Sequence, residues 1–418
     1  MKFLFGVSFL FMMWSSLWAT DVYIETLHPN EARLPLGYIE FRPVDGETRK
    51  LPLDFGKVIA DDLNFSGRVK IIEALRADSL TMNYFMHNEA YAYISGDYAY
   101  QGANVVIRCF LKDVETNEQI LGKKYIAQRN QLRQVAHRFS DELIYQLFGE
   151  KGIAQTQIVF VSKQSGTKAI YTMDYDGANY QKASANTSLN LLPCWMRDNK
   201  AIMYTSYKLG RPQLFFKALP NGIETVFQIS KFMNTGATYN PVDGEVAYTS
   251  SVKGNTEIFR VSEAGGKPVR LTYSKAMETS PSWSPNGYEI VFTSSRAGPP
   301  MLYIMDRDGS NVRRLTYEGN YNTSPAWSPK GDKIAFCSMG AGGKMNIFTI
   351  SPTGANLRKL TFDSGSNEHP SWSPDGRAIV FCSNRLGRKE IYQMQEDGSG
   401  QRQVTFFGQN MAPDWSFY

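Results

Sequence analysis

The sequence is poor in the residues from which catalytic and metal centres are usually built. It has only four histidines and four cysteines in 418 residues, and no HExxH, no close histidine pair and no CxxC. Neither a GxSxG nucleophile elbow nor a P-loop or GxGxxG after a strand occurs. The sequence therefore predicts no enzyme, no catalytic residue, no metal and no cofactor.

Runs of like charge and long apolar runs are also scarce. Lys and Arg number 45 against 40 Asp and Glu, and no basic run indicates nucleic-acid binding. Only the N-terminus departs from this: Phe3 to Leu17 carry no charge and precede small residues at Ala19 and Thr20. Such a stretch is typical of a secretory signal peptide. We expect residues 1–19 to be the leader, with cleavage near Ala19, and no direct membrane insertion.

The cysteines are few and lie far apart in the sequence. Cys337 and Cys382 hold the same place in two successive repeats, "AFCS" and "VFCS". Equivalent positions of a repeat array usually lie too far apart for a disulfide, even in an oxidising compartment. We expect all four cysteines to be free, buried and to act as small apolar residues.

What the sequence does contain is a repeat of 43 to 45 residues, marked by an aromatic residue at Trp195, Tyr239, Trp283, Trp327, Trp372 and Trp415. Seven residues after each of the first five stands an Ile or Val that begins a strand such as "IVF". Four short strands per unit, joined by Asn-Gly or Asp-Gly turns, are typical of a propeller blade. Six units predict a six-bladed β-propeller over residues 151–418, with the aromatic residues packed between blades.

The two ends of the repeat array complete one another. "TQIVFVS" (156–162) has no aromatic strand before it, and "MAPDWSFY" (411–418) has no strand after it. Pairing these ends would complete one blade and remove the open edges of the array.

Residues 20–150 lack the repeat and mix the two periodicities. Strands are indicated at 21–27, 36–41 and 69–75, and a hairpin across 105–128 turns at Glu115–Glu118. Two amphipathic helices are indicated by inward-facing Phe55, Val58, Ile59 and Leu63 in the first and Leu132, Val135, Phe139, Leu143 and Leu147 in the second. His137 lies off the second apolar face, so we expect it to be solvated. The fold class is thus mostly β, with a small α/β domain (20–150) before the propeller.

Without a catalytic motif, function is expected at the surface. In a four-stranded blade, the connections from the fourth strand to the next blade and from the second strand to the third emerge on one face, here called the loop face. Lys208, Arg296 and Arg385 occupy matching places in the second set, and His369 stands where two other blades carry serine. These loops suit protein contact around the central opening. Hydrophilic loops are also the ordinary solvated surface of a propeller.

The sequence resembles the TolB family of periplasmic Tol–Pal components. The resemblance rests on the "PxWSPDG" units and on "LPLGYIEF", "VIADDLNFSGRVKII", "GIAQTQIVFVS", "MDYDGAN" and the terminal "DWSFY". It covers essentially the whole chain, and the N-terminal domain makes it specific because other propellers share the repeat. It implies a monomeric periplasmic adaptor that binds the lipoprotein Pal and the protein TolA, and supports outer-membrane integrity and constriction during division.

The resemblance also implies which residues bind. Pal contacts fall on the loops before the aromatic strands, where Thr279 in "METSPSW" and Thr323, preceded by Asn322, match the family pattern. Met233 and Gly236 lie in the corresponding loop of another blade, but "MNTGATY" departs from the family's histidine and proline. The TolA segment comprises Asp21, Val22, Tyr23, Ile24, Glu25, Thr26 and Leu27. This segment could pair with a partner by β-augmentation, or be the first strand of the domain.

Two other functions stay open. An exported propeller that binds glycan or peptidoglycan directly predicts exposed aromatic side chains on the loop face, for which Tyr321 is a candidate. A lyase or peptidase on a propeller scaffold predicts a charged or metal-binding cluster in the central channel, and the sequence offers no obvious one.

Overall fold

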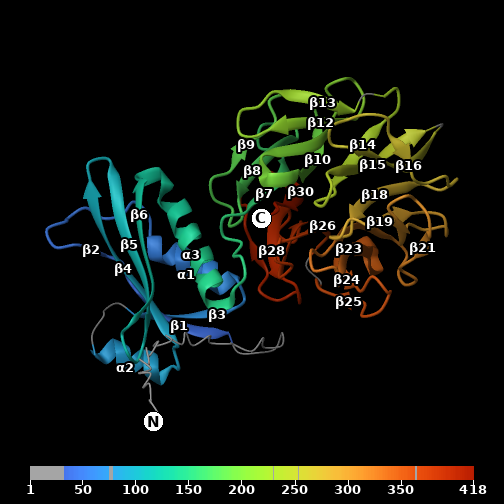
Figure 1. Ribbon diagram of the computed structural model, residues 1–418. Helices are drawn as coiled ribbons and strands as arrows, with labels where there is room; N and C mark the ends of the chain where they lie inside the picture. Colours follow the sequence, from blue (N-terminus) through green and yellow to red (C-terminus); the bar gives the residue numbers. More distant parts are fainter. Residues whose placement is uncertain (1–32, 75–78, 229, 253, 363–364) are drawn as a thin grey trace, which may run out of the picture. The chain divides into compact units, whose positions relative to one another are not determined.

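The computed structural model describes residues 33–74, 79–228, 230–252, 254–362 and 365–418, and residues 34–418 form one compact unit. Strands are the main secondary structure of the described chain (Figure 1). The predicted signal peptide and TolA segment lie outside the described residues. Within the described ranges, no helix is both long enough and apolar enough to cross a bilayer.

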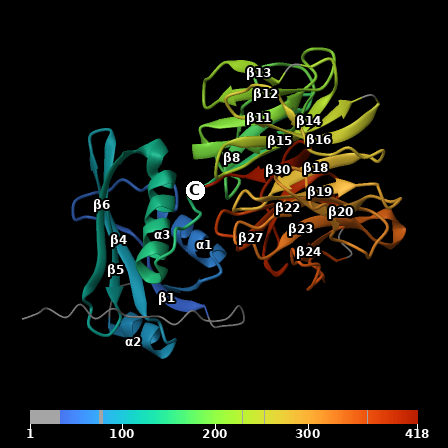
Figure 2. The same ribbon diagram turned by 45° about the vertical axis from the view of Figure 1, so that its right-hand side comes forward.

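The N-terminal elements build one mixed sheet with three helices. They are β1 (Leu34–Ile39), β2 (Arg42–Pro43), α1 (Phe55–Phe65), β3 (Val69–Ala74), α2 (Ser79–His87), β4 (Ala92–Gln101), β5 (Asn104–Asp113), β6 (Gln119–Gln128) and α3 (Leu132–Phe148). The strand order is β3-β1-β4-β5-β6, with β2 beside β4. Helices α1 and α3 lie against the same side of this sheet (Figures 1 and 2). The α/β fold class is therefore confirmed for this region.

Both predicted helices form and bury their predicted faces. The side chain of Asp54 caps α1 by accepting the Lys57 N–H at 2.9 Å. The apolar residues predicted for both helices join one core with the sheet, Val135 being only partly buried. Helix α3 ends at Gly149, which adopts a φ of 68°. The predicted hairpin is the β5–β6 pair, whereas α2 and β4 were not anticipated from the sequence.

The prediction that His137 is solvated was wrong. His137 is 2% exposed, and its Nδ1 lies 2.8 Å from Oδ2 of Asp62, on α1. A carboxylate on the neighbouring helix gives an imidazole a buried partner that helical periodicity cannot reveal. Burial opposes the charged form of His137, but the hydrogen bond and charge of Asp62 outweigh it and raise the pKa of His137.

The remaining strands form six antiparallel four-stranded sheets, the blades. Five blades are contiguous in sequence: β10 (Asn190–Trp195), β11 (Ala201–Ser206), β12 (Gln213–Ala218) and β13 (Glu224–Gln228); β14 (Asn234–Tyr239), β15 (Glu245–Val252), β16 (Asn255–Ser262) and β17 (Val269–Arg270); β18 (Glu278–Trp283), β19 (Glu289–Ser294), β20 (Met301–Asp306) and β21 (Arg313–Arg314); β22 (Asn322–Trp327), β23 (Ile334–Met339), β24 (Met345–Ile350) and β25 (Arg358–Lys359); β26 (Asn367–Trp372), β27 (Ala378–Ser383), β28 (Glu390–Gln395) and β29 (Arg402–Gln403).

The sixth blade joins the two ends of the array. It consists of β30 (Asn410–Trp415) followed by β7 (Gln157–Ser162), β8 (Ala169–Asp174) and β9 (Gln181–Lys182). Trp415 pairs with Ile158 in the same register as Trp283 with Ile290 in another blade. The six-bladed propeller is thus confirmed, and so is the pairing of its ends.

The antiparallel order gives the propeller two distinct faces. Each first strand runs away from the loop face, so the connections from first to second and from third to fourth strand emerge on the opposite face, here called the turn face. At the start of β16, the Asn255 amide donates to the carbonyl oxygens of Ser274 and Ala276, each at 2.8 Å. This contact holds the connection that follows β17 at the loop face.

Candidate partner-binding face and central channel

The predicted threonines line the inner edge of the loop face. Thr279 and Thr323 are the second residues of their first strands, and both are half-buried. The Thr323 hydroxyl lies 3.5 Å from that of Thr293 in the preceding blade, and Thr235 lies 3.1 Å from Thr205 in the same way. A repeated hydroxyl pair therefore links neighbouring blades where the channel opens on this face.

A bulge follows these threonine positions in every first strand. The bulged residues have φ between 47° and 59°: Leu192, Gly236, Ser280, Ser324, His369 and Ala412. The pairing register shifts at the same place in each blade. Gly236 adopts this left-handed conformation without the strain that a Cβ brings. His369 thus sits at a strand bulge and not in a loop as predicted, and burial lowers its pKa.

Two residues predicted to contact the partner make hydrogen bonds within the loop face. Asn322 is 1% exposed, and its amide donates to the Glu318 carbonyl at 2.8 Å, which closes its own loop. Met233 is half-buried, and its N–H donates to the Ser251 hydroxyl at 3.0 Å. The structure therefore places Asn322 beneath the contact surface, a position that its sequence column does not reveal.

The three predicted cations are engaged within their own blades. Arg296 pairs with the buried Glu278 at 3.0 Å, and its guanidinium lies over the Tyr303 ring. Arg385 donates to Asn367 at 3.0 Å, and Lys208 lies 3.8 Å from Glu224. Each cation is held by a partner in its own blade, while Lys208 and Arg296 remain exposed at the loop face.

The loop face instead exposes large apolar side chains that the sequence analysis mostly missed. Residues at least 37% exposed in its connections, or in the case of Met339 at the strand end before one, are Tyr207, Leu209, Tyr273, Met277, Tyr317, Tyr321, Met339, Phe362, Leu386 and Phe406. Tyr321 was the one candidate named from sequence. The "LTY", "LTY", "LTF" and "VTF" triplets that close four fourth strands were the available signal.

The loop face is also basic. Each of the six connections between second and third strands contains Lys or Arg, and none contains Asp or Glu. By contrast, four of the six connections between third and fourth strands, on the turn face, contain Asp or Glu. Tyr, Met and Arg are enriched in protein interfaces, so the loop face is suited to binding a protein. Because its connections are basic, the matching partner surface would be acidic.

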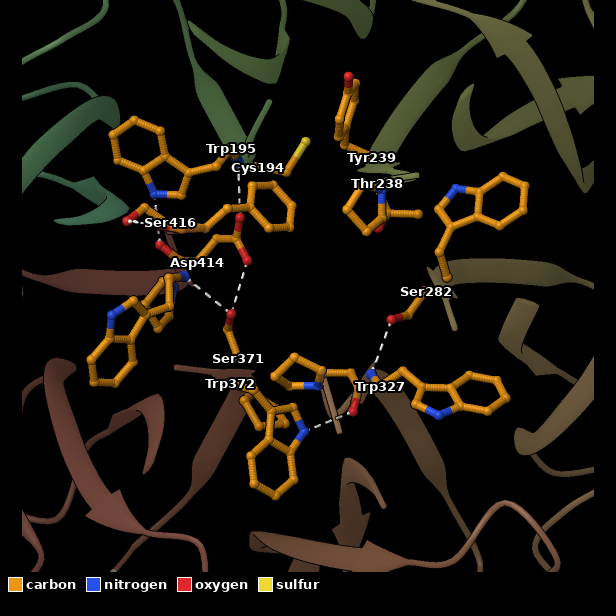
Figure 3. Close-up of a pocket in the computed structure, with 18 of the residues that line it drawn as sticks. Cys194, Trp195, Thr238, Tyr239, Ser282, Trp327, Ser371, Trp372, Asp414 and Ser416 are labelled. Atoms are coloured by element: carbon orange, nitrogen blue, oxygen red, sulfur yellow. Dashed lines mark hydrogen bonds between the residues drawn. The ribbon is translucent and has the colours of Figure 1, made fainter. Parts of the chain in front are cut away.

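The central channel holds a cavity of about 580 Å³. The second halves of the first strands line it (Figure 3), together with prolines of the turns that follow four of them. It therefore occupies the half of the channel toward the turn face. Of the predicted site residues, Gly236 and His369 line this cavity, while Thr279 and Thr323 lie beyond its loop-face end.

Asp414 ties three blades together in the cavity wall. One carboxylate oxygen accepts the Trp195 N–H and the other accepts the Ser371 hydroxyl, both at 2.9 Å (Figure 3). Ser371 in turn accepts the Trp415 N–H at 3.1 Å. Burial raises the pKa of Asp414 to about 6. Asp414 was not predicted as a site residue. Its only sequence signal is that the equivalent position of the other five repeats holds a small residue.

The group of side chains best placed to hold a metal among the described residues lies outside the channel. It consists of Asp62, His137 and Asp176. The two carboxylates flank the imidazole on opposite nitrogens, at 2.8 Å and 3.5 Å, and Arg133 also pairs with Asp176. One ion cannot take both ring nitrogens, so the arrangement fits a protonated imidazole between two carboxylates better than a metal.

The four thiols are free and buried, as predicted. Cys337 accepts the His369 N–H at 3.3 Å, which places it on the second strand behind a residue of the channel wall. Burial raises the pKa of Cys382 to about 12, so this thiol is not a nucleophile at neutral pH.

Comparison with known proteins agrees with this architecture. The family described as "TolB beta propeller domain" matches residues 145–345 and 323–418. A Tol-Pal system protein TolB of Geobacter sulfurreducens is 36% identical over 182 residues, 41% of this chain and 42% of that protein. A TolB homolog of Chlorobium chlorochromatii is 34% identical over 216 residues, 50% of this chain and 49% of that protein. The chain thus matches about half or less of the length of these curated relatives.

A solved structure extends the likeness in fold to nearly the whole chain. The crystal structure of TolB from Acinetobacter baumannii superposes with a TM-score of 0.79 at 23% identity, covering 93% of this chain and 98% of that one. Several of the sequence relatives are named as proteins of the Tol-Pal system. The chain belongs to the TolB β-propeller family.

Proposed function

We propose that this protein is a periplasmic adaptor of the Tol–Pal system. It binds Pal through the loop face of the propeller and TolA through its N-terminal segment, and so supports outer-membrane integrity and constriction during division. It acts as a monomer, without a cofactor. Relatives named as Tol-Pal system proteins, together with the sequence resemblance, support this proposal.

The observation that carries the Pal proposal is the contrast between the faces. The loop face surrounds the channel mouth with paired threonines, exposed Tyr, Met and Leu side chains and basic connections. Such a mixture of apolar anchors and basic side chains is typical of a protein-binding surface. Thr279 and Thr323 stand at its centre and are the residues we expect Pal to contact.

The experiment is a calorimetric titration of the mature chain with the soluble domain of the same organism's Pal. We expect a Kd of about 1 μM or tighter, about −8 kcal/mol. The double variant Thr279→Arg, Thr323→Arg should abolish binding, because two long cations would enter the mouth without partners. The matched control, Val242→Arg with Tyr288→Arg, adds the same charge at exposed turn-face positions and should bind Pal like the parent.

Two results would decide against the proposal. No heat and no complex in gel filtration with the parent chain would remove Pal as the partner. Binding lost in the turn-face control but kept in the threonine variant would place the interface on the opposite face.

The TolA proposal has its own test. A chain lacking residues 21–27 should lose TolA binding in a pull-down and keep its affinity for Pal, because the segment lies before the first described strand. Retained TolA binding would move that contact elsewhere in the protein.

A further inference from the structure

Four of the exposed aromatic residues hold one repeated position at the outer end of the loop face. We call Tyr273, Tyr317, Phe362 and Phe406 the aromatic rim; they are 77%, 72%, 62% and 68% exposed. Each follows a Leu-Thr or Val-Thr pair that closes a fourth strand. Large aromatic side chains on four successive blades are not needed for packing between blades, since the buried tryptophans already fill that role.

The rim side chains stand on a fixed backbone. The threonine before each one is buried. Its hydroxyl oxygen accepts a backbone N–H of the third strand at 2.9 to 3.0 Å, from Ile258, Leu302, Ile347 and Ile391 in turn. Little backbone freedom is therefore lost when a ligand settles on the ring that follows.

Three rim rings are backed by a cation from their own blade. The Arg270 guanidinium lies 4.5 Å from the Tyr273 centroid, Arg314 lies 4.8 Å from that of Tyr317, and the Lys359 ammonium lies 5.2 Å from that of Phe362. A cation over one face of a ring leaves the other face free for a flat ligand. Each of these three platforms therefore offers an aromatic surface with a cation beside it, and the cation beside Tyr273 also pairs with the buried Glu257 at 2.8 Å.

The remaining two blades lack the platform. Ala185 holds the equivalent position after β9, and Ile229 holds it in the sequence after β13. The rim thus covers four adjacent blades as an arc and not as a closed ring. An extended ligand lying along consecutive blades fits this distribution better than one centred on the channel.

The arrangement distinguishes a polymer from a globular partner. Protein hot spots cluster near the centre of an interface, where neighbours exclude water. The rim side chains stand singly, one per blade, at the periphery. A chain of repeated units can occupy such sites one after another, and several weak contacts then add through effective concentration.

We propose that the aromatic rim binds an acidic glycan of the cell wall, a chain of N-acetylated hexosamines bearing carboxylates. The C–H faces of pyranose rings stack on the electron-rich faces of Tyr and Phe, and Arg314 and Lys359 pair with the carboxylates. This activity is separate from Pal binding and requires only that the protein meets peptidoglycan in the periplasm. It makes the adaptor a direct wall contact on the same face.

The test is co-sedimentation of the full mature chain with purified peptidoglycan sacculi, followed by titration with soluble glycan strands carrying stem peptides. The double variant Tyr317→Ser, Phe362→Ser should bind about ten-fold or more weakly, because two stacking platforms are lost. Tyr288→Ser is the matched control, since Tyr288 is 66% exposed on the turn face, and it should bind like the parent. Ala185→Tyr should strengthen binding by extending the arc.

The outcomes separate this proposal from the Pal proposal. The Thr279→Arg, Thr323→Arg variant should keep glycan binding while losing Pal. Parent protein that stays in the supernatant, or rim and control variants that bind glycan equally, would overturn the glycan site. Rim variants that weaken Pal binding and leave glycan binding unchanged would also overturn it and make the rim part of the protein interface. Thermal unfolding of each variant checks that the highly exposed substitutions leave the fold intact.

Discussion

The loop face and the turn face come from one repeat, yet their glycines meet different surroundings. On the turn face, a Cβ on Gly177, Gly309 or Gly398 would lie 2.2, 2.3 or 2.7 Å from a carbonyl oxygen of the neighbouring blade. On the loop face, a Cβ on Gly254, Gly298 or Gly387 would meet nothing within 4 Å. At the first three positions the turn face packs blade against blade through the backbone, whereas the three loop-face positions are open.

This difference explains why recognition is expected on only one face. Positions packed against a neighbouring main chain cannot change without disturbing the ring of blades. The loop-face connections can take any side chain that keeps the backbone conformation, and here they took aromatic and basic ones. Stability and binding are therefore divided between the two ends of the same strands.

The largest effect should come from the core that both faces share. Phe336 is 1% exposed inside its blade, and Phe362, in the connection to the next blade, is 62% exposed. Phe336→Ala should lower the free energy of unfolding by about 4 kcal/mol, because it leaves a cavity. Phe362→Ala should change it by less than about 0.5 kcal/mol. Urea denaturation of both variants measures the difference, and a large loss in Phe362→Ala would show that the rim is structural.

A second pair of variants compares the faces directly. Gly309 and Gly298 have similar φ angles, 90° and 99°. Gly309→Ala should cost about 3 kcal/mol of unfolding free energy, because strain adds to a collision with the Leu271 carbonyl. Gly298→Ala should cost about 1 kcal/mol, from strain alone. Equal losses in urea denaturation would mean that backbone strain, and not packing between blades, is the reason why Gly309 must be glycine.

Most of the propeller could be predicted from sequence because its signal repeats. One aromatic column fixed the phase of six blades, and the pairing of Trp415 with Ile158 followed from the incomplete units at both ends. The α/β domain offers each signal once. Helix α2 and strand β4 were not predicted, because the segment "LTMNYFMHNEAYAYISGDYAYQ" mixes the helical and the strand periodicity without clear turn residues.

The candidate site was predictable in place but not in its partners. The repeat placed Thr279, Thr323 and His369 in the loops before the first strands, whereas the structure has them inside those strands. The burial of Asn322 and the pairing of Arg296 with Glu278 depend on side-chain directions that no spacing reveals. The bond from His137 to Asp62 joins residues 75 positions apart. The aromatic rim was visible in sequence, and only its exposure required the structure.

The smallest predicted effect concerns Asp414, in the channel between the two faces. Its pKa of about 6, above the usual value, means that the folded state holds this proton more tightly than the unfolded chain. The stability that protonation gives is complete at low pH and is lost as pH rises from about 4 to about 6. Asp414→Asn cannot ionise, and its amide can still accept from Trp195 and donate to Ser371. Relative to the parent, the variant should therefore gain about 1 kcal/mol of unfolding free energy between pH 4.5 and pH 7.5, since the open channel screens part of the effect.

Urea denaturation at both pH values measures this gain. The control is Ser282→Ala, at the equivalent uncharged position, where the Ser282 hydroxyl accepts the Trp327 N–H. Parallel profiles for the parent and Asp414→Asn would mean that water in the cavity solvates the carboxylate fully, and that the channel is as open to solvent as the loop face.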